Sequence, residues 1–211
     1  MKVGSNMMKF YQEITLFHTP DISMSFLWGK LFMQLHIAFV EAKRTDNGIE
    51  FGIAFPYYDL LFAENKGEDE EDGSPFTNVI RIFANKEEDL QTLQQVWRLQ
   101  AFEEYLHIKG IRPVPEKRVK GYATYSRYQL DGSVHQKAKR FSKRHEGVTY
   151  EEALSFMKQK QGISNMPYIK MRSLTSKQSF SLFIKKTLTD MPKQGRFNAY
   201  GLSVDGTVPE F

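Results

Sequence analysis

The order of two hydrophobic periods along the first half of the chain restricts the folds that it can adopt. Residues 9–18, KFYQEITLFH, alternate apolar and polar side chains as a strand does, whereas residues 23–42 repeat as an amphipathic helix. Two further strand patterns occupy residues 48–58 and 78–84, and residues 85–108 predict a long second helix with room for a break. This order indicates a mixed fold in which helices cover a sheet.

A short last strand near residues 107–114 would complete a βαββαβ unit, which is the ferredoxin-like arrangement. The prolines of RPVPEK, residues 112–117, provide the natural domain boundary after it. We therefore predict a ferredoxin-like domain over residues 1–114 and a second domain over residues 115–211.

The second half of the chain contains strands, then helices, then strands. An extended, aromatic-rich stretch, VKGYATYSRYQL, occupies residues 119–130 and precedes two helical segments. Three strand candidates follow, PYIKMRS (167–173), FSLFIKKTL (180–188) and RFNAYGLSV (196–204). The mixed order predicts an α+β protein whose C-terminal domain combines a basic helix with a small antiparallel sheet.

Charge is distributed unevenly between the two halves, although the whole chain has a net charge of only +4. Residues 1–114 hold 11 Lys and Arg against 17 Asp and Glu, which leaves −6, whereas residues 115–211 hold 18 against 8, which leaves +10. Such an asymmetry indicates that the C-terminal half binds a polyanion.

The segment HQKAKRFSKRH, residues 135–145, concentrates this positive charge. On a helix, its basic residues fall within an arc of about 160°. These residues are Lys137, Lys139, Arg140, Lys143 and Arg144. Ala138 and Phe141 lie on the opposite side, so we expect Phe141 to anchor the helix to the domain behind it. A solvated surface helix without a partner is the alternative interpretation.

Capping signals mark the ends of this helix and the start of the next one. Ser133 can cap the start of the basic helix, and Gly147 can supply the left-handed residue that ends it. Thr149 and Glu152 have the spacing of a capping box, which predicts a second helix over residues 150–160.

Composition excludes several kinds of site. The chain has no cysteine, which removes disulfides, thiolate nucleophiles and cysteine metal ligands. Its five histidines show none of the spacings typical of a zinc site, and neither a phosphate-binding glycine loop nor a G-x-S-x-G elbow is present. We therefore expect no metal ion and no cofactor.

Two other stretches bear on the cellular location of the protein and on calcium binding. Residues 26–40 form the longest apolar-leaning stretch, which is too short to span a bilayer, and no signal-peptide pattern opens the chain. We therefore expect a cytoplasmic protein. The acidic stretch GEDEEDGSPF, residues 67–76, lacks the ligand spacing of an EF-hand, so we interpret it as a solvated loop.

With these sites excluded, the sequence leaves general acid–base catalysis by a histidine, assisted by hydroxyl groups. His36 lies at the edge of the apolar stripe of the first helix, where a histidine is by default a core residue. Hydroxyl side chains gather in RSLTSKQS, residues 172–179, and at Tyr200. They are ordinary turn and edge-strand residues unless a polyanion binds beside them, in which case they can orient a phosphate or a sugar hydroxyl.

Four blocks in the same order resemble the CRISPR repeat-processing endoribonucleases of the type I-F systems, the Csy-type nucleases. LFMQLHIAFV (31–40) is similar to the family's first-helix segment, which carries its catalytic histidine. YSRYQLDGSVHQKAKRFSKRH (125–145) is similar to the S-R-x-Q linker and the arginine-rich helix. PYIKMRSLTSKQSFSLFI (167–184) resembles the R-S-x-S/T strand pair, and AYGLSVDGTVPEF (199–211) resembles the Y-G-L-S and V-P-x-F ending.

The resemblance implies an endoribonuclease that cuts a CRISPR repeat RNA stem-loop at the base of its stem without a metal ion. His36 would be the general base for the 2′-hydroxyl, which attacks the adjacent phosphate and leaves a 2′,3′-cyclic phosphate. Ser173 would hold the attacking sugar, and Tyr200 would orient the histidine. The family also implies that the protein stays on its product as a subunit of a crRNA-guided surveillance complex.

Base-reading residues follow from the same resemblance. Arg127 would span O6 and N7 of a guanine, and Gln129 would span N6 and N7 of an adenine. Phe180 would stack on the terminal base pair of the stem. Arg172 and Thr175 belong to the strand pair that the family uses to bind RNA.

The basic helix would lie along the major groove of the hairpin, as it does in the family. Lys139 and Lys143 stand where the family carries arginine, so their contacts would be point charges instead of bidentate forks.

Two other functions are compatible with these residues. An RNA-hairpin clamp without catalytic activity would use the same basic helix, and His36 would then be structural. A helix for anionic membranes is a further alternative, but its apolar face is small, and Arg127 and Gln129 would have no role there.

Overall fold

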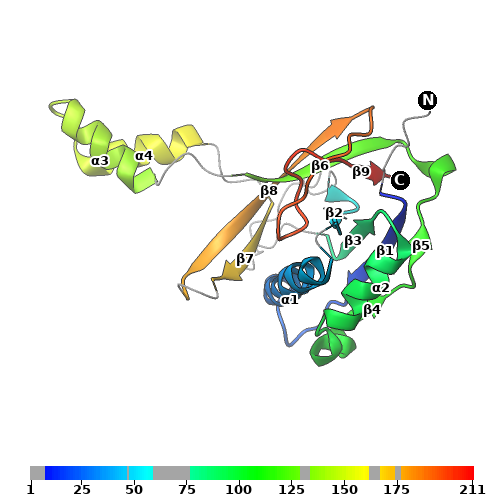
Figure 1. The fold of residues 1–211 in the computed structure, drawn as a ribbon. Helices are drawn as coiled ribbons and strands as arrows, with labels where there is room; N and C mark the ends of the chain where they lie inside the picture. Colours follow the sequence, from blue (N-terminus) through cyan, green and yellow to red (C-terminus); the bar gives the residue numbers. More distant parts are fainter. Residues whose placement is uncertain (1–7, 47, 59–76, 129–133, 162–166, 174–176) are drawn as a thin grey trace. The chain divides into compact units, whose positions relative to one another are not determined.

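Figure 1 shows the fold of the chain as a computed structural model, which describes residues 8–46, 48–58, 77–128, 134–161, 167–173 and 177–211. Helices and antiparallel sheets occur together, which confirms the predicted α+β class. The acidic stretch 67–76 and the cap residue Ser133 lie outside the described residues.

Contacts divide the chain into two compact units, Met1–Arg127 together with Pro167–Phe211, and Tyr128–Met166. This division differs from the predicted boundary near residue 114. The strands after residue 166 share a sheet with the strand that begins at Gly121, and one of them packs on the first helix. These contacts join the C-terminal strands to the N-terminal half, and the helical segment between them forms the second unit.

The first sheet has the strand, helix, strand, strand, helix, strand order that the sequence predicts. Its strands are β1 (Phe10–Leu16), β2 (Gly52–Ala54), β3 (Val79–Ala84), β4 (Leu106–Ile108) and β5 (Arg112–Pro113). The order across the sheet is β2-β3-β1-β4, and β5 also pairs with β1. The described pairings are antiparallel, with Ile14 opposite Ile80 on β3 and Ile108 on β4.

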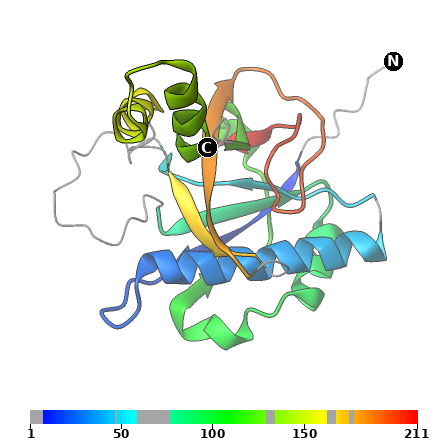
Figure 2. The same ribbon diagram turned by 90° about the vertical axis from the view of Figure 1, so that its left-hand side faces the viewer.

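Two helices cover one face of this sheet, α1 (Met24–Thr45) and α2 (Glu87–Val96), and they lie side by side (Figure 2). The hydroxyl of Ser23 caps α1 by accepting a hydrogen bond from the backbone N–H of Phe26, at 3.3 Å. The predicted second helix is interrupted, because a short 3₁₀ helix, η2 (Gln100–Tyr105), follows α2 before β4 begins.

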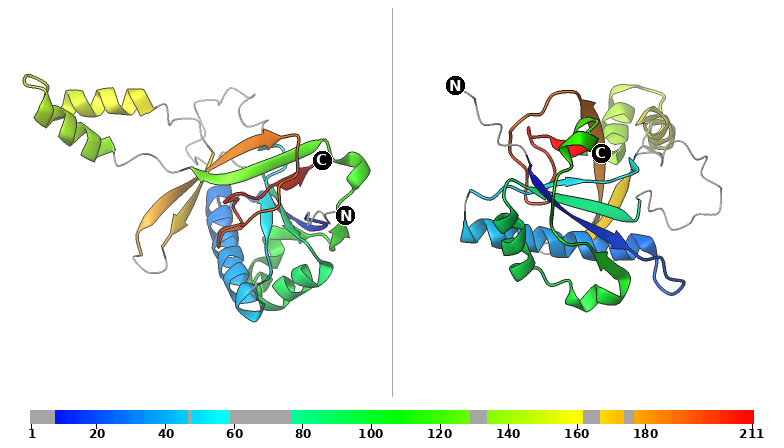
Figure 3. Two further views of the ribbon diagram at one scale, coloured as in Figure 1. Left: turned by 45° about the horizontal axis from the view of Figure 1, so that its top comes forward. Right: turned by 90° about the vertical axis from the view of Figure 1, so that its right-hand side faces the viewer.

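The second sheet is built from the aromatic-rich stretch and the C-terminal segments. Its strands are β6 (Gly121–Tyr128), β7 (Tyr168–Arg172), β8 (Ser179–Thr189) and β9 (Val208–Glu210), and a 3₁₀ helix, η3 (Glu116–Arg118), precedes them. The order is β7-β8-β6-β9, and Figure 3 shows β6 beside β8. α1 approaches β7 so closely that a Cβ atom at Gly29 would lie 2.5 Å from the carbonyl oxygen of Lys170.

The prediction of a strand over residues 196–204 is wrong. Only an isolated bridge joins Phe197 to Ser203, because the chain reverses between them at Gly201, whose φ is +73°. The last strand is instead β9, which the sequence analysis did not predict. β9 contains Pro209, and it lies at the edge of the sheet, where a strand tolerates a residue without a backbone N–H.

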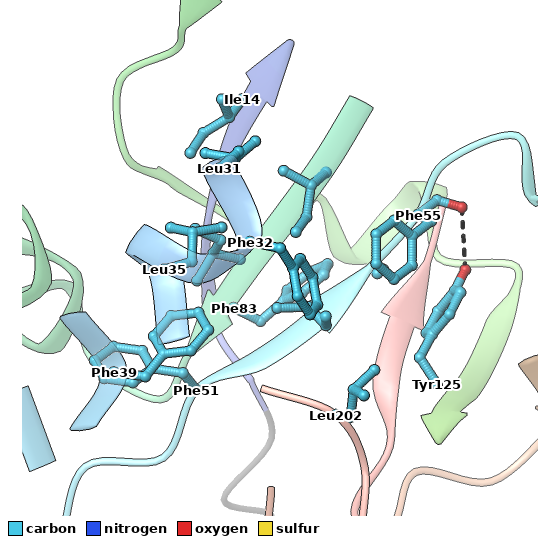
Figure 4. Close-up of a cluster of buried hydrophobic side chains, with 14 of the residues drawn as sticks. Ile14, Leu31, Phe32, Leu35, Phe39, Phe51, Phe55, Phe83, Tyr125 and Leu202 are labelled. Carbon is cyan, nitrogen blue, oxygen red and sulfur yellow. Dashed lines mark hydrogen bonds between the residues drawn. The ribbon is translucent and has the colours of Figure 1, made fainter. Parts of the chain in front are cut away.

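One hydrophobic core joins α1 to both sheets. Figure 4 shows the side chains of Phe32 and Phe39 from α1 beside Phe51 and Phe55 from the chain around β2. Tyr125 of β6 reaches the same core and donates a hydrogen bond from its hydroxyl to the carbonyl oxygen of Phe55, at 3.3 Å. These five aromatic side chains are almost completely buried, so the position of α1 relative to both sheets is held by a large apolar area.

The described part of the unit Tyr128–Met166 consists of two helices, α3 (Val134–Arg144) and α4 (Tyr150–Gln161), which lie against each other (Figure 1). Ala138 of α3 and Ala153 of α4 are fully buried. Gly147 lies between the helices with φ at +87°, as predicted for the residue that ends the basic helix.

Candidate functional site

His36 lies on α1, at the border between the buried and the exposed faces of the helix. The neighbouring buried positions are Phe32, Leu35 and Phe39, which repeat at helical spacing and face the core. The side chain of His36 is only partly buried. The position of α1 is therefore held by core side chains, while the imidazole of His36 remains at the edge of that core.

The backbone of a distant segment determines which nitrogen of His36 carries a proton. The Nδ1 atom lies 2.8 Å from the carbonyl oxygen of Ala199. A carbonyl oxygen can only accept a hydrogen bond, so Nδ1 carries the hydrogen and donates it. In the neutral imidazole, Nε2 then holds the lone pair, which is the form that a general base requires.

Tyr200 follows directly after Ala199 and packs its ring on the imidazole. The two ring centroids are 4.2 Å apart, and the rings are inclined by 19°. The ring of Phe32 lies in a stacked arrangement with Tyr200, with centroids 6.1 Å apart and an angle of 7°. The structure therefore brings His36 and Tyr200 together, and the contact between them is ring stacking.

The turn that carries Ala199 and Tyr200 is held by its own residues. The side-chain oxygen of Asn198 accepts hydrogen bonds from the backbone N–H groups of Tyr200, at 2.8 Å, and Leu202, at 3.1 Å. Gly201 follows with positive φ, and its carbonyl oxygen accepts a hydrogen bond at 3.0 Å from the N–H of Ile53 on β2. These bonds attach the turn to the first sheet.

The space next to Gly201 is filled by core side chains. A Cβ atom at this position would lie 2.7 Å from Cγ2 of Ile53 and 3.0 Å from Cε2 of Phe39. Only glycine therefore fits here, both for its φ angle and for the space.

A groove of about 920 Å³ lies between α1 and the hairpin of β7 and β8. Arg172, Ser173 and Phe180 line it, so three of the predicted site residues share one surface with the first half of α1. Met33 of α1 also lines the groove, and it precedes His36 by one helical turn.

Backbone hydrogen bonds hold the end of the β7–β8 hairpin. The N–H of Ser173 donates to the carbonyl oxygen of Gln178 at 2.8 Å, and the N–H of Lys177 donates to the carbonyl oxygen of Ser173 at 3.0 Å. The Nε of Arg172 donates to the carbonyl oxygen of Lys177 at 3.0 Å. Thr175, another predicted RNA-binding residue, lies outside the described residues.

Arg127 ends the strand portion of the first unit and lies near Phe180. Its guanidinium carbon is 6.0 Å from the centroid of the Phe180 ring, which is within the range of a cation–π contact. The two residues predicted to read and to stack on bases are therefore neighbours on adjacent strands. Gln129 lies outside the described residues.

The basic side chains of α3 face solvent within their own unit. Lys139, Arg140, Lys143 and Arg144 are exposed, and Lys137 is partly buried. On the other side of the helix, the ring of Phe141 stacks on that of Phe156 in α4, with centroids 5.8 Å apart. The expected anchoring contact of Phe141 is thus made to α4.

The predicted capping box at the start of α4 is confirmed. The Thr149 hydroxyl accepts a hydrogen bond from the N–H of Glu152 at 3.2 Å, and the Glu152 carboxylate accepts one from the N–H of Thr149 at 2.9 Å. Hydrogen bonds from the backbone and the hydroxyl of Thr149 lower the pKa of Glu152.

In the described part of the chain, no group of three or more His, Asp and Glu side chains lies close enough together to hold a metal ion. Its helices are also too short or too polar to cross a lipid bilayer.

The Ala199 carbonyl is the part of the candidate site that the sequence analysis missed. It is a backbone atom 163 residues away from His36, and the amino-acid type at residue 199 does not reveal it. The available signal was the pair Asn198 and Gly201 around this position, because Asn and Gly are typical turn residues.

Comparison with known proteins identifies the family. Residues 11–211 match the family described as CRISPR-associated protein (Cas_Csy4). The chain is 28% identical over 207 residues to the CRISPR-associated endonuclease Cas6/Csy4 of Escherichia coli (strain UTI89 / UPEC), an alignment that covers 97% of this chain and all of the relative. It is also 28% identical over 206 residues to the protein with the same description from Pseudomonas aeruginosa (strain UCBPP-PA14), with 97% and 100% of the two chains covered.

The family match extends over nearly the whole chain, and both relatives align along their full length. The chain belongs to the Csy4 family of CRISPR-associated proteins.

Proposed function

We propose that this chain is a CRISPR RNA-processing endoribonuclease that cuts repeat RNA at the base of a stem-loop without a metal ion. Its relatives are described as CRISPR-associated endonucleases. The observation that carries the proposal is the hydrogen bond from Nδ1 of His36 to the Ala199 carbonyl, because it leaves Nε2 as a base.

The reaction begins at the ribose just upstream of the cut. Nε2 of His36 takes the proton of the 2′-hydroxyl, and the 2′-oxygen forms a bond to the adjacent phosphorus. The bond from phosphorus to the 5′-oxygen of the next nucleotide breaks, and that oxygen takes up a proton. The products are a 2′,3′-cyclic phosphate on the upstream RNA and a 5′-hydroxyl on the downstream RNA.

Each proposed site residue has a distinct task. Ser173, on the groove wall, holds the attacking sugar so that the 2′-oxygen lies in line with the bond that breaks. Tyr200 keeps the imidazole plane fixed by stacking on it. A base positioned in this way contributes about 10²–10⁴-fold to the rate.

RNA recognition is assigned to two surfaces. Arg127 and Gln129 read bases, Phe180 stacks on the last base pair of the stem, and Arg172 and Thr175 bind the RNA near the cut. The phosphates of the stem bind the basic face of α3, formed by Lys137, Lys139, Arg140, Lys143 and Arg144. Retention of the product hairpin and assembly with other subunits of a cytoplasmic, crRNA-guided surveillance complex complete the proposal.

The test of this function is cleavage of a repeat hairpin in which deoxyribose replaces the ribose just upstream of the cut. We expect the unmodified hairpin to be cut and to yield a 2′,3′-cyclic phosphate, detected by mass spectrometry of the product ends. The deoxyribose hairpin has no nucleophile and should stay intact. Cleavage of that hairpin would contradict attack by the 2′-hydroxyl.

The same assay in the presence of EDTA tests metal independence. We expect an unchanged rate, because the proposed base is a side chain. A strong loss of activity that added Mg²⁺ restores would contradict this part of the proposal.

A further inference from the structure

An ion pair at the end of α1 lies outside the residues assigned to the cut. Nζ of Lys43, in the last turn of α1, lies 2.9 Å from Oε2 of Glu50, which precedes β2. Their side chains are partly buried, with 23% and 30% of the surface exposed. An ion pair that solvent screens in this way adds little to stability by itself, so its effect on the structure depends on the other groups that it contacts.

Both members of this pair bind the backbone of Phe197. Nζ of Lys43 donates to the carbonyl oxygen of Phe197 at 3.2 Å, and Oε2 of Glu50 accepts from the N–H of Phe197 at 3.0 Å. The bridge between Phe197 and Ser203 uses hydrogen bonds of the flanking residues, so the polar backbone groups of Phe197 point away from Ser203. Hydrogen bonds to charged groups are stronger than those between neutral groups, so this backbone is held firmly.

The bound backbone is close to the hydrogen-bond acceptor of His36. Phe197 lies two residues before Ala199, whose carbonyl oxygen accepts the hydrogen bond from Nδ1 of His36. His36 and Lys43 are seven residues apart on α1, which is about two turns, so they lie on the same face of the helix. One face of α1 therefore holds the same short segment at two points.

The core fixes the position of Glu50. The next residue, Phe51, is completely buried, and its ring stacks on that of Phe39 of α1, with centroids 5.1 Å apart (Figure 4). Lys43 follows Phe39 by one helical turn. The two charged side chains thus extend from positions that an aromatic contact holds together, so the pair is a rigid support for Phe197.

We propose that Lys43 and Glu50 are positioning residues for cleavage. By holding Phe197, they keep the carbonyl oxygen of Ala199 against Nδ1 of His36. The inference rests on the proposed function, because it concerns the same base. When the carbonyl moves away, the hydrogen of the neutral imidazole can shift to Nε2, and that nitrogen then no longer accepts the proton of the 2′-hydroxyl. Neither Lys43 nor Glu50 lines the groove or belongs to α3, so RNA binding should not depend on them.

The first test measures the single-turnover cleavage rate and the affinity for the deoxyribose hairpin. Lys43→Met and Glu50→Ala should each lower the rate about tenfold and leave the affinity unchanged. Because the two side chains act as one unit, the double variant should lose about as much as either single variant. Lys43→Arg keeps the charge and the N–H donors, and Glu50→Gln keeps an oxygen acceptor for Phe197, so both should recover most of the rate.

The second test does not require activity. NMR spectra of protein with ¹⁵N-labelled histidine show which ring nitrogen carries the hydrogen, at about pH 8, where free histidine is neutral. The spectrum of His36→Ala identifies the His36 signals among those of the five histidines. We expect the hydrogen on Nδ1 in the parent protein and a larger share on Nε2 in Lys43→Met and Glu50→Ala.

Two control variants separate positioning from other effects. Arg44→Met removes the neighbouring cation of α1, which is exposed. Glu13→Gln removes the carboxylate that pairs with Arg81 and Lys109, so it weakens the first unit at a different place. Both variants should keep the parent rate and the hydrogen of His36 on Nδ1, and thermal unfolding should show that all variants are folded.

Three results would overturn the inference. Folded Lys43→Met and Glu50→Ala proteins that cut at the parent rate would show that the ion pair has no part in cleavage. A lower rate with the hydrogen of His36 still on Nδ1 would show that the pair does not act through this imidazole. An equal loss of rate in Glu13→Gln would show that the rate follows stability in general. Failure of the parent protein to cut the hairpin would instead contradict the proposed function, while NMR would still test whether the ion pair determines which nitrogen of His36 carries the hydrogen.

Discussion

Gly201 and Gly147 both have positive φ angles, +73° and +87°, but their surroundings differ completely. Gly201 precedes a buried leucine in the turn that carries Tyr200, and core side chains of Ile53 and Phe39 fill the space where a Cβ would lie. Gly147 joins α3 to α4, and apart from the adjacent residues no atom lies within 4 Å of the position that a Cβ would take. One turn is part of a packed core, and the other is open to solvent.

The difference between the two turns corresponds to the tasks proposed for the two units. Proton transfer to His36 requires reacting atoms held within a fraction of an ångström, and a displacement of about 1 Å can cost about 10²-fold in rate. Attraction between a basic helix and phosphates falls off slowly with distance and tolerates many geometries. A packed turn serves the first task, whereas two helices with a small core are sufficient for the second.

Substitution of alanine at the two glycines gives the largest expected contrast. In both variants the new alanine must adopt a left-handed backbone conformation, which destabilises the folded protein by about 1 kcal/mol. Gly201→Ala also forces Ile53 or Phe39 to move, so we expect the turn to shift and the cleavage rate to fall by about 10²-fold. Gly147→Ala should leave the cleavage rate at saturating RNA unchanged. Single-turnover kinetics together with thermal unfolding measure both effects.

Equal losses of rate in the two glycine variants would contradict the distinction between a packed and an open turn. A folded Gly201→Ala variant that keeps its full rate would show that the position of the Tyr200 turn does not matter for catalysis.

Removal of charge from the basic face should affect binding and leave stability unchanged. In the triple variant Lys139→Gln, Arg140→Gln and Lys143→Gln, we expect RNA affinity to fall by about 10- to 100-fold and the slope of log affinity against log salt to decrease by about three. The melting temperature should stay the same, because these side chains are exposed. Filter binding at several salt concentrations measures the slope.

A control for this triple variant removes two charges from the other unit, so the changes are compared per charge removed. Arg44→Gln with Arg98→Gln replaces two exposed arginines outside the groove and outside α3. If the control changed the salt slope as much as the triple variant does, α3 would have no special role in binding.

Phe141→Ala tests the small core of the helix pair. The ring of Phe141 contacts Phe156, which is itself 48% exposed, so we expect a loss of about 1–2 kcal/mol, less than for a fully buried phenylalanine. RNA affinity should weaken by a few-fold as α3 loses its support. Cleavage at saturating RNA should stay within about twofold of the parent protein, and a larger loss would show that α3 also fixes the geometry of the cut.

Substitution of Glu13 should have the smallest effect on activity, and it tests the stability of the first unit. Burial would raise its pKa, but hydrogen bonds from Lys109 and Arg81 outweigh burial and lower it. A lowered pKa in the folded state means that the ionised carboxylate contributes stability above the ordinary glutamate pKa of 4.5, and that this contribution is lost as the pH falls. Glu13→Gln should cost about 1–2 kcal/mol at neutral pH and little at pH 3.

Urea unfolding of Glu13→Gln and of the parent protein between pH 3 and pH 7 measures the difference in their free energies of unfolding. Glu152→Gln is the comparison in the helix pair, where the pKa of an exposed carboxylate is also lowered. We expect a smaller change there, because solvent screens the carboxylate. If the two free energies of unfolding differed by the same amount at every pH, ionisation of Glu13 would not be the source of the stability.

Local signals in the sequence predicted the local features of this structure. Thr149 and Glu152 form their predicted box at the start of α4, because this motif is satisfied by residues three positions apart. The predicted strands at residues 9–18 and 78–84 are present as β1 and β3, because a strand pattern is also a local property of the sequence.

The features that the sequence did not predict depend on long-range contacts. Residues 196–204 alternate as a strand does, but Asn198 bonds to the backbone two and four residues on, and Gly201 fits against Ile53, so the chain turns. The pattern around His36 could not show which ring nitrogen carries the hydrogen, because its partner is the backbone carbonyl of Ala199. Every residue has a backbone carbonyl, so the amino-acid type does not show which carbonyl will bind the histidine.

The most direct test of the central claim is to measure the cleavage rate and the RNA affinity of His36→Ala side by side. His107→Ala, which removes an exposed histidine on β4, is the matched control. We predict that His36→Ala loses at least about 10²-fold in single-turnover rate and keeps its affinity for the deoxyribose hairpin, while His107→Ala changes neither. A His36→Ala protein that cuts the repeat hairpin at the parent rate would contradict the account and leave only an RNA-binding role for this site.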